Sequence, residues 1–280
     1  MLPNVATALK MILEDRCLPV LVGEFFGCYF HCQVTRNLCG LTVACGKLRA
    51  RCMDREPGAV TELQTVDIET GPSPAASIIW MHGLGADAHD FEPAVPMLRL
   101  DSGRAVRFVF PNAPLRPVTI NGGMQMRAWY DLVSMDRDAP EDEAGIRASA
   151  VSIEALIRRE QERGVAADRI VMAGFSMGGA MALFTALRYP EKLAGILALS
   201  TYVPIAPVVE AEASTANLGL PIFMAHGQVD DVVPFNFARN SRKRLHQMGY
   251  DVEWHEYPMA HSVIPEELQD IKVFLERVIG

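Results

Sequence analysis

Three residues, Ser176, Asp230 and His261, follow one another along the chain in an order that suits nucleophilic catalysis. Ser176 lies between Gly174 and Gly178 in the pattern Gly-x-Ser-x-Gly, after a short apolar run and before a run of helical composition. A serine at such a strand-to-helix turn projects its hydroxyl above the sheet, and its small neighbours let strand and helix approach closely. The chemistry expected of this serine is attack on a carbonyl carbon, with formation of an acyl-enzyme.

A nucleophilic serine needs a general base, and the base needs an acid that orients it. Asp230 and His261 each follow a predicted strand, so both are expected on loops at the edge of the sheet where the serine turn lies. We predict that Asp230 is the acid and His261 the base, with the adjacent Asp231 as the alternative acid. His226 ends the strand before the acid and is expected to pack and form hydrogen bonds locally.

The tetrahedral intermediate of acyl transfer carries an oxyanion that needs two N–H donors. One donor is normally the residue after the nucleophile, here Met177, where the free N–H groups and the dipole of a helix N-terminus favour negative charge. The second is expected from the loop His82-Gly83-Leu84-Gly85, and we predict the N–H of Leu84. The alternative interpretation of this loop is a tight turn without a catalytic role.

The segment 112–134 is rich in Pro, Gly, Met and aromatic residues and is longer than a plain connection needs to be. Segments of that length in compact domains are usually functional or disordered. Four of its apolar residues are predicted to line a pocket for a short or medium acyl chain, and methionine adapts readily to such a role: Met124, Met126, Trp129 and Leu132. The alternative is that these side chains fill the core.

The elements that must position these residues alternate along the chain. Strands are predicted over residues 62–68, 76–81, 107–110, 170–173, 195–200, 221–226 and 251–257, and helices over 90–98, 139–164, 177–188, 234–248 and 265–278. Such alternation predicts an α/β fold in which a mostly parallel sheet has helices on both faces.

Composition divides the 280 residues into two parts. All six cysteines lie before Met53, and residues 1–52 carry six Lys or Arg against three Asp or Glu, whereas the rest carries 20 against 31. We therefore predict a Cys-rich extension over 1–52, not native or dispensable, and a catalytic domain over 53–280. No Cys-x-x-Cys pair points to a metal site in the extension.

Partner and location follow from the same composition. The acidic charge after residue 52 and the lack of a basic patch argue against a nucleic-acid partner. The apolar stretch 17–30 is too short to span a membrane, and Glu14 and Asp15 occupy the place of a basic signal-peptide region. We therefore expect a cytoplasmic protein without a membrane span, whose exposed apolar surface would allow a homodimer.

Five segments together resemble the bacterial carboxylesterase and acyl-protein thioesterase family of α/β-hydrolases: HGLGADAHDF, FPNAPLRPVTINGGMQMRAWYD, GFSMGGAMAL, HGQVDDVVP and AHSVIPEEL. The resemblance extends from about residue 63 to the C-terminus and does not include residues 1–52. It implies an α/β-hydrolase fold without a large cap domain, and it matches the segment 114–129 to the acyl-pocket loop of the family. It also implies the roles given above for Ser176, Asp230, His261, Leu84 and Met177.

The resulting prediction is a serine carboxylesterase that hydrolyses short- to medium-chain esters through an acyl-enzyme on Ser176. This chemistry requires no metal or organic cofactor. The alternative is a thioesterase that acts on acylated protein or acyl-coenzyme A, or a lysophospholipase, since these use the same chemistry on another small-molecule ester or thioester. A more distant alternative is a binding protein on a hydrolase scaffold that has lost catalysis.

The prediction for residues 1–52 can be tested by truncation. A chain that begins at Met53 should fold, because the break in composition and the extent of the resemblance both exclude the extension from the catalytic domain. Mass spectrometry of the untagged protein and thermal unfolding of the truncated chain are the measurements. A mature protein that retains residue 1 and unfolds when shortened would contradict the prediction.

Overall fold

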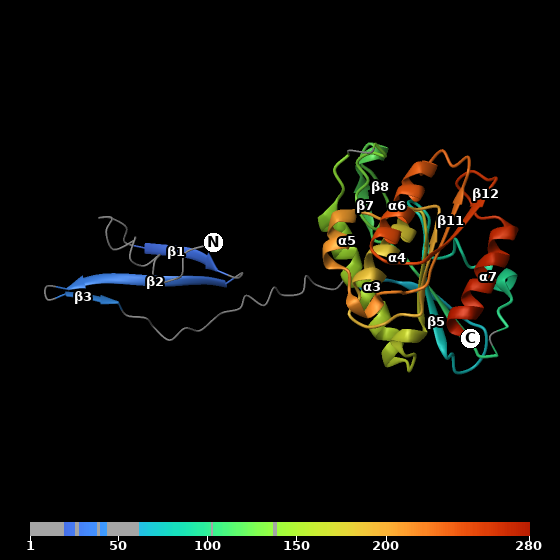
Figure 1. The fold of residues 1–280 in the computed structure, drawn as a ribbon, viewed down its shortest axis with the longest axis horizontal. Coiled ribbons are helices and arrows are strands. Elements are labelled where there is room, and N and C mark those ends of the chain that lie inside the picture. The colour runs from blue at the N-terminus through green and yellow to red at the C-terminus, as the bar shows by residue number, and fades with distance from the viewer. Residues whose placement is uncertain (1–19, 26–27, 38–39, 44–61, 102, 137–138) are drawn as a thin grey trace. The chain divides into compact units, whose positions relative to one another are not determined.

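The computed structural model describes residues 20–25, 28–37, 40–43, 62–101, 103–136 and 139–280, and the chain divides into two compact units, Met1–Ala59 and Val60–Gly280 (Figure 1). In the first unit, β1 (Val20–Phe25), β2 (Cys28–Asn37) and β3 (Gly40–Val43) form an antiparallel sheet in that order. The predicted domain boundary after residue 52 lies outside the described residues and stays a prediction.

A sheet in the order β12-β11-β10-β9-β5-β6-β4 forms the centre of the second unit. Its strands are β4 (Thr65–Glu69), β5 (Ala76–Met81), β6 (Val106–Pro111), β9 (Ile170–Phe175), β10 (Gly195–Leu199), β11 (Ile222–Gly227) and β12 (Val252–Tyr257). All neighbours are parallel except β4, which pairs antiparallel with β6. Strands β5, β6, β10 and β11 are buried along their whole length, as their continuous apolar sequences predict.

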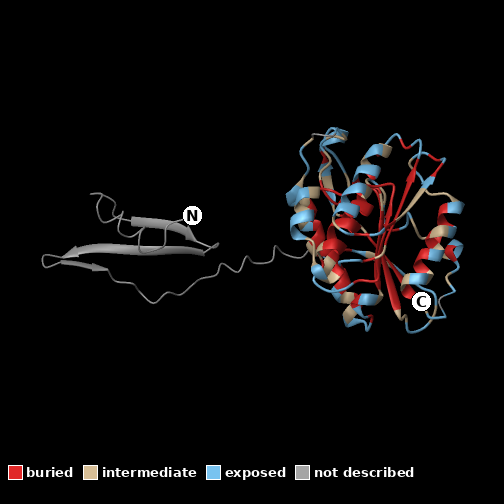
Figure 2. Ribbon diagram, viewed as in Figure 1, coloured by how far each residue is buried: buried red, intermediate tan, exposed pale blue. Residues whose placement is uncertain are grey.

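Helices cover both faces of this sheet, so the predicted fold class is confirmed (Figure 2). One core cluster joins the sheet to α3 (Glu143–Glu162), α4 (Met177–Arg188), α5 (Ala206–Glu212) and α6 (Phe235–Gln247). The other joins the opposite face to α2 (Ala94–Leu98) and α7 (Pro265–Ile279). Short 3₁₀ turns occur at Thr119–Asn121, Ala167–Arg169 and Thr215–Asn217. None of the helices in the described ranges is long and apolar enough to cross a membrane.

The structure differs from the predicted elements at three places. The helix predicted over 90–98 is only α2, because Pro93 disfavours helical backbone at the residue before it. The segment 112–134 is not a plain loop, since β7 (Leu115–Val118) and β8 (Met124–Arg127) pair antiparallel. Gly122 and Gly123, with φ of 66° and 79°, form the turn between them. The short helix α5 was not predicted.

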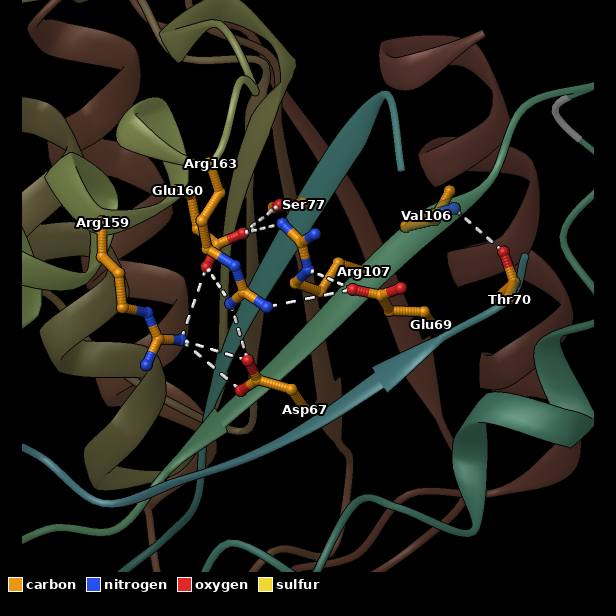
Figure 3. Close-up of polar contacts among 9 residues, drawn as sticks. All are labelled: Asp67, Glu69, Thr70, Ser77, Val106, Arg107, Arg159, Glu160 and Arg163. Carbon is orange, nitrogen blue, oxygen red and sulfur yellow. Dashed lines mark hydrogen bonds and ion pairs between the residues drawn. The ribbon is translucent and has the colours of Figure 1, made fainter. Parts of the chain in front are cut away.

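An ion network joins the edge strand β4 to β6 and α3 (Figure 3). The fully buried Glu160 accepts hydrogen bonds from Ser77 Oγ at 2.8 Å and from Arg107 at 2.7 Å, and Arg107 also donates to Glu69 at 2.8 Å. Burial would raise the pKa of Glu160, but the hydrogen bonds from Arg107 and Ser77 more than offset it and lower that pKa. Because Ser77 lies at the start of β5, the network secures the end of the sheet opposite Ser176.

Glu267, in the first turn of α7, is a fully buried carboxyl whose two oxygens have no hydrogen-bond partner among the described residues. Burial raises the pKa of Glu267 to about 8, against a weaker opposing effect of the Ile264 backbone. The folded state therefore holds this proton more tightly than the unfolded chain, in which a glutamate has its ordinary pKa. The free energy of unfolding should fall as the pH rises from about 4.5 through about 8.

Replacement of Glu267 by glutamine should remove this pH dependence, because an amide cannot ionise. We expect Glu267→Gln to unfold with a free energy close to that of the wild type at pH 5 and about 1–3 kcal/mol higher at pH 9. Urea unfolding at pH 5, 7 and 9 measures the difference, with the exposed neighbour in Glu266→Gln as the control. Parallel pH profiles for wild type and Glu267→Gln would show that the pKa of Glu267 does not differ between the folded and unfolded states, and would contradict the prediction.

Candidate active site

Ser176 lies between β9 and α4 in a backbone conformation that is rare for a residue with a side chain, with φ of 55° and ψ of −122°. Three hydrogen bonds hold it there. Its N–H donates to Leu199 O at 2.8 Å, and its carbonyl accepts from Ala180 N at 3.1 Å and from Thr201 Oγ1 at 2.7 Å. The strain is therefore sustained by β10 and by the first turn of α4, as is typical of functional positions.

Two glycines let the N-terminus of α4 pack directly against the sheet. A Cβ atom on Gly178 would lie 2.3 Å from the carbonyl oxygen of Met81 at the end of β5. A Cβ atom on Gly174 would lie 2.3 Å from the carbonyl carbon and oxygen of Gly178. Neither position admits a side chain, so the glycines of the Gly-x-Ser-x-Gly pattern are required by backbone packing.

Asp230 and His261 lie together on the loops that follow β11 and β12. The Nδ1–H of His261 donates to Asp230 Oδ2 at 2.7 Å, because a carboxylate oxygen can only accept. The other oxygen, Asp230 Oδ1, accepts from the N–H groups of Val232 at 2.9 Å and Val233 at 2.8 Å. This contact fixes the tautomer that leaves His261 Nε2 free to accept a proton. The alternative acid, Asp231, is exposed.

The two loops are close because Gly227 ends β11. A Cβ atom on Gly227 would lie 2.4 Å from Met259 O and 2.5 Å from Ala260 O. Backbone hydrogen bonds then cross from one loop to the other, from Gln228 N to Tyr257 O at 2.8 Å and from Val229 N to Met259 O at 3.2 Å. The position of His261 relative to Asp230 is thus set by backbone contacts as well as by the side chains.

His261 also lies beside the serine turn. Its ring centroid is 4.6 Å from that of Phe175, the residue that precedes Ser176. Among the described residues, no hydrogen bond joins the Ser176 hydroxyl to His261. Such contacts are often long in the absence of substrate and tighten when it binds.

The two predicted oxyanion donors have free N–H groups. Neither Leu84 nor Met177 donates its backbone N–H to an acceptor in the part of the chain that the structure describes. Met177 is the first residue of α4, where an N–H has no partner within the helix. A Cβ atom on Gly83 would lie 3.4 Å from Ser176 Cβ, so the Gly83–Leu84 peptide adjoins the serine. The arrangement suits an anion that forms at a carbonyl attacked by Ser176.

His226 is buried, as the sequence predicted for a residue that packs locally. It contacts Val233 O at 2.9 Å through Nε2, which lies 3.4 Å from Asp230 Oδ2. Burial lowers the pKa of His226. Its contacts support the loop that carries Asp230.

The four residues predicted to line a pocket have different environments. Met124 is exposed, whereas Met126 and Leu132 are half-buried and pack against the core. Trp129 is fully buried, and its Nε1–H donates to His82 O at 2.9 Å. The structure thus places Trp129 in the core behind the loop that carries Leu84.

The expectation that no basic patch follows residue 52 is wrong. Helix α6 carries basic side chains at helical spacing, namely Arg239, Arg242, Lys243 and His246. Arg242 lies over the ring of Trp254, with its guanidinium carbon 5.5 Å from the centroid. The basic residues can be seen in the sequence of this helix, but the net charge of the residues after 52 is negative and does not reveal them. The absence of a nucleic-acid partner stays a prediction that rests on total charge alone.

No group of three or more His, Cys, Asp and Glu side chains in the described ranges is placed to hold a metal ion. The buried contacts of His82 and Trp129 were not foreseen from the sequence. The pair His82-Gly83 marked the loop, but no local pattern could assign an acceptor to the indole of Trp129, which lies 47 positions away in the chain.

Comparison with known proteins gives a consistent result. The family described as Phospholipase/Carboxylesterase matches residues 64–279. Acyl-protein thioesterase 1 of Mycosarcoma maydis is 36% identical over 236 residues, which cover 79% of this chain and 98% of that protein. Acyl-protein thioesterase 1 of Neurospora crassa is 43% identical over 217 residues, with coverage of 71% and 85%. Both relatives are fungal, whereas the predicted resemblance was to bacterial members.

Solved structures show the same fold. Zea mays acyl-protein thioesterase 2 superposes with a TM-score of 0.69 at 29% identity, covering 78% of this chain and 99% of that one. Esterase PE8 superposes with a TM-score of 0.67 at 26% identity, with coverage of 78% and 99%.

The assignment of the acid can be tested by two neighbouring substitutions. Asp230→Asn should lower kcat for an activated ester by about 1,000-fold or more, because an amide does not hold the His261 tautomer that accepts the serine proton. Asp231→Asn should keep kcat within about threefold, since that side chain is exposed. Steady-state kinetics of both variants give the two kcat values. A large loss of kcat in Asp231→Asn but not in Asp230→Asn would show that Asp231 is the acid.

Proposed function

We propose that this chain, which belongs to the phospholipase/carboxylesterase family, hydrolyses the thioester bonds of acylated proteins through an acyl-enzyme on Ser176. Membership of the family makes the chain a hydrolase of carboxylic esters or thioesters. The observation that carries the finer proposal is the 36–43% identity to acyl-protein thioesterases over most of their length. The geometry around Ser176 supports it.

The first half of the proposed reaction acylates the serine. His261 Nε2 takes the proton of Ser176 Oγ as the oxygen attacks the thioester carbonyl, and Asp230 stabilises the imidazolium that forms. The N–H groups of Leu84 and Met177 donate to the oxyanion of the tetrahedral intermediate. His261 then gives the proton to the departing sulfur, and the carbon–sulfur bond breaks.

The second half releases the acid. Water attacks the acyl-enzyme while His261 takes its proton, and the collapse of the second tetrahedral intermediate returns the proton to Ser176 Oγ. A thiol has a much lower pKa than an alcohol and is the easier leaving group. The same residues therefore serve thioesters and oxygen esters, and the preference depends on contacts outside the triad.

The acyl chain is proposed to lie along the half-buried Met126 and Leu132, with Met124 at the exposed end. Met126 is adjacent to the oxyanion loop, since a Cβ atom on Gly85 would lie 3.9 Å from its sulfur. Flexible methionine side chains suit chains of differing length.

A second candidate function is a carboxylesterase for short- to medium-chain esters, which the likeness to a solved esterase favours. The two functions share every step above and differ only in the leaving group. A cytoplasmic location and a homodimer stay predictions, which cell fractionation and sedimentation of the purified protein would test.

The discriminating experiment uses one acyl chain on two leaving groups. We expect kcat/KM for S-octanoyl cysteine in a peptide to exceed that for the O-octanoyl serine peptide by at least about tenfold, and Ser176→Ala to lower both by about 10,000-fold or more. A preference for the oxygen ester would favour the carboxylesterase. Retained activity in Ser176→Ala would exclude Ser176 as the nucleophile. A folded wild type that hydrolyses neither peptide would contradict the proposed thioesterase and favour a binding protein on a hydrolase scaffold.

A further inference from the structure

The imidazole of His82 is a buried group at the site to which the mechanism above gives no role. It follows β5, and its ring contacts two backbone groups. Nδ1 lies 2.7 Å from Gly83 O, and Nε2 lies 3.1 Å from the backbone nitrogen of Ala113. Because the Ala113 N–H can only donate, Nε2 is the acceptor and carries no proton. Nδ1 therefore carries the proton and donates to Gly83 O.

Nothing in these contacts leaves room for a charged ring. A second proton on Nε2 would face the Ala113 N–H, and burial lowers the pKa of His82. The ring is thus a neutral donor with one tautomer. Its Nδ1–H is a fixed group aimed at a single carbonyl.

That carbonyl belongs to the peptide that carries the predicted oxyanion donor. Gly83 O and the N–H of Leu84 lie in one planar trans peptide and point in opposite directions. A hydrogen bond that holds Gly83 O on one side therefore sets the direction of the Leu84 N–H on the other. This N–H has no acceptor among the described residues, and the peptide adjoins Ser176.

We propose that His82 is a positioning residue, whose Nδ1–H bond to Gly83 O turns the Leu84 N–H toward the oxyanion. The proposal rests on the proposed function, since it gives the Leu84 N–H a role only if Ser176 forms a tetrahedral intermediate. The hydrogen bond also polarises the peptide and strengthens the N–H as a donor. Loss of the bond would therefore affect the transition state more than the bound substrate.

Trp129 holds His82 in place from the other side. Its Nε1–H donates to His82 O at 2.9 Å, and the two rings lie with centroids 5.4 Å apart. The backbone nitrogen of Trp129 lies 3.3 Å from the sulfur of Met177, whose own N–H is the other predicted oxyanion donor. Trp129 therefore contacts Met177 as well as the loop that carries Leu84. The far end of the loop is held by the hydrogen bond from Gly85 N to Arg127 O at 2.9 Å. The Gly83–Leu84 peptide is thus held on both sides.

Two substitutions at His82 separate its two contacts. In His82→Asn the side-chain amide nitrogen takes the place of Nδ1 and keeps the donor to Gly83 O. In His82→Gln the longer side chain places its amide oxygen near the position of Nε2, which keeps the acceptor for Ala113 but loses the bond to Gly83. We expect kcat to fall by at least about 30-fold in His82→Gln. In His82→Asn the fall in kcat should be about tenfold smaller, and KM should stay within about threefold of the wild-type value in both variants.

A matched tryptophan pair tests the support from Trp129. Trp80 is likewise fully buried, but its Nε1 has no acceptor among the described residues. Both Trp129→Phe and Trp80→Phe should lower Tm, because each removes buried ring volume. Only Trp129→Phe should lower kcat, by about tenfold, together with the affinity for a trifluoromethyl ketone that forms an oxyanion on Ser176. Trp80→Phe should keep kcat within about threefold.

Several outcomes would overturn the positioning role. These are equal kcat in the two His82 variants, a rise in KM without loss of kcat, or equal loss of kcat in the two tryptophan variants. If His82→Gln does not fold, by circular dichroism, the tryptophan pair with the ketone decides. If His82→Gln keeps the wild-type kcat while Ser176→Ala is inactive, the positioning role is excluded and the proposed function stands. An active Ser176→Ala removes the proposed function and this role together.

Discussion

The contact between the first turn of α4 and the end of β5 is the constraint on which the site depends. It brings two backbones so close that a Cβ atom on Gly178 would lie 2.3 Å from Met81 O. The same contact sets Ser176 beside the loop that follows β5 and directs the helix N-terminus at the space between them. The strained backbone of Ser176 persists because β10 and α4 bind its N–H and carbonyl.

Around this contact, the remaining groups are held by satisfied polar contacts rather than by exposed charge. Both oxygens of Asp230 are occupied, one by two backbone N–H groups and one by His261. The side-chain N–H groups of His82 and Trp129 similarly donate to backbone carbonyls of the loop next to Ser176. The N–H groups of Leu84 and Met177 are left without acceptors in the described residues, where preorganised donors are needed.

A network of buried and half-buried charge pairs lies at the opposite end of the sheet. There Glu160, Arg107 and their partners hold the antiparallel edge strand β4 and the helix α3 to β6 (Figure 3). Removal of one partner would leave an uncompensated charge in the core, which is costly. Glu267 is a contrasting case, because its carboxyl is buried without a partner and takes up a proton instead.

Elements whose pattern is local could be predicted from the order of the residues alone. Buried strands such as β5 and the helix Met177–Arg188 were predicted with the bounds the structure has, because apolar runs and helical composition are properties of neighbouring residues. The order of Ser176, Asp230 and His261 was likewise readable. Three features became known only from the folded chain: Asp230 rather than Asp231 contacts His261, Trp129 lies behind His82, and β7 pairs with β8. These depend on contacts between residues far apart in the chain, which local periodicity does not encode.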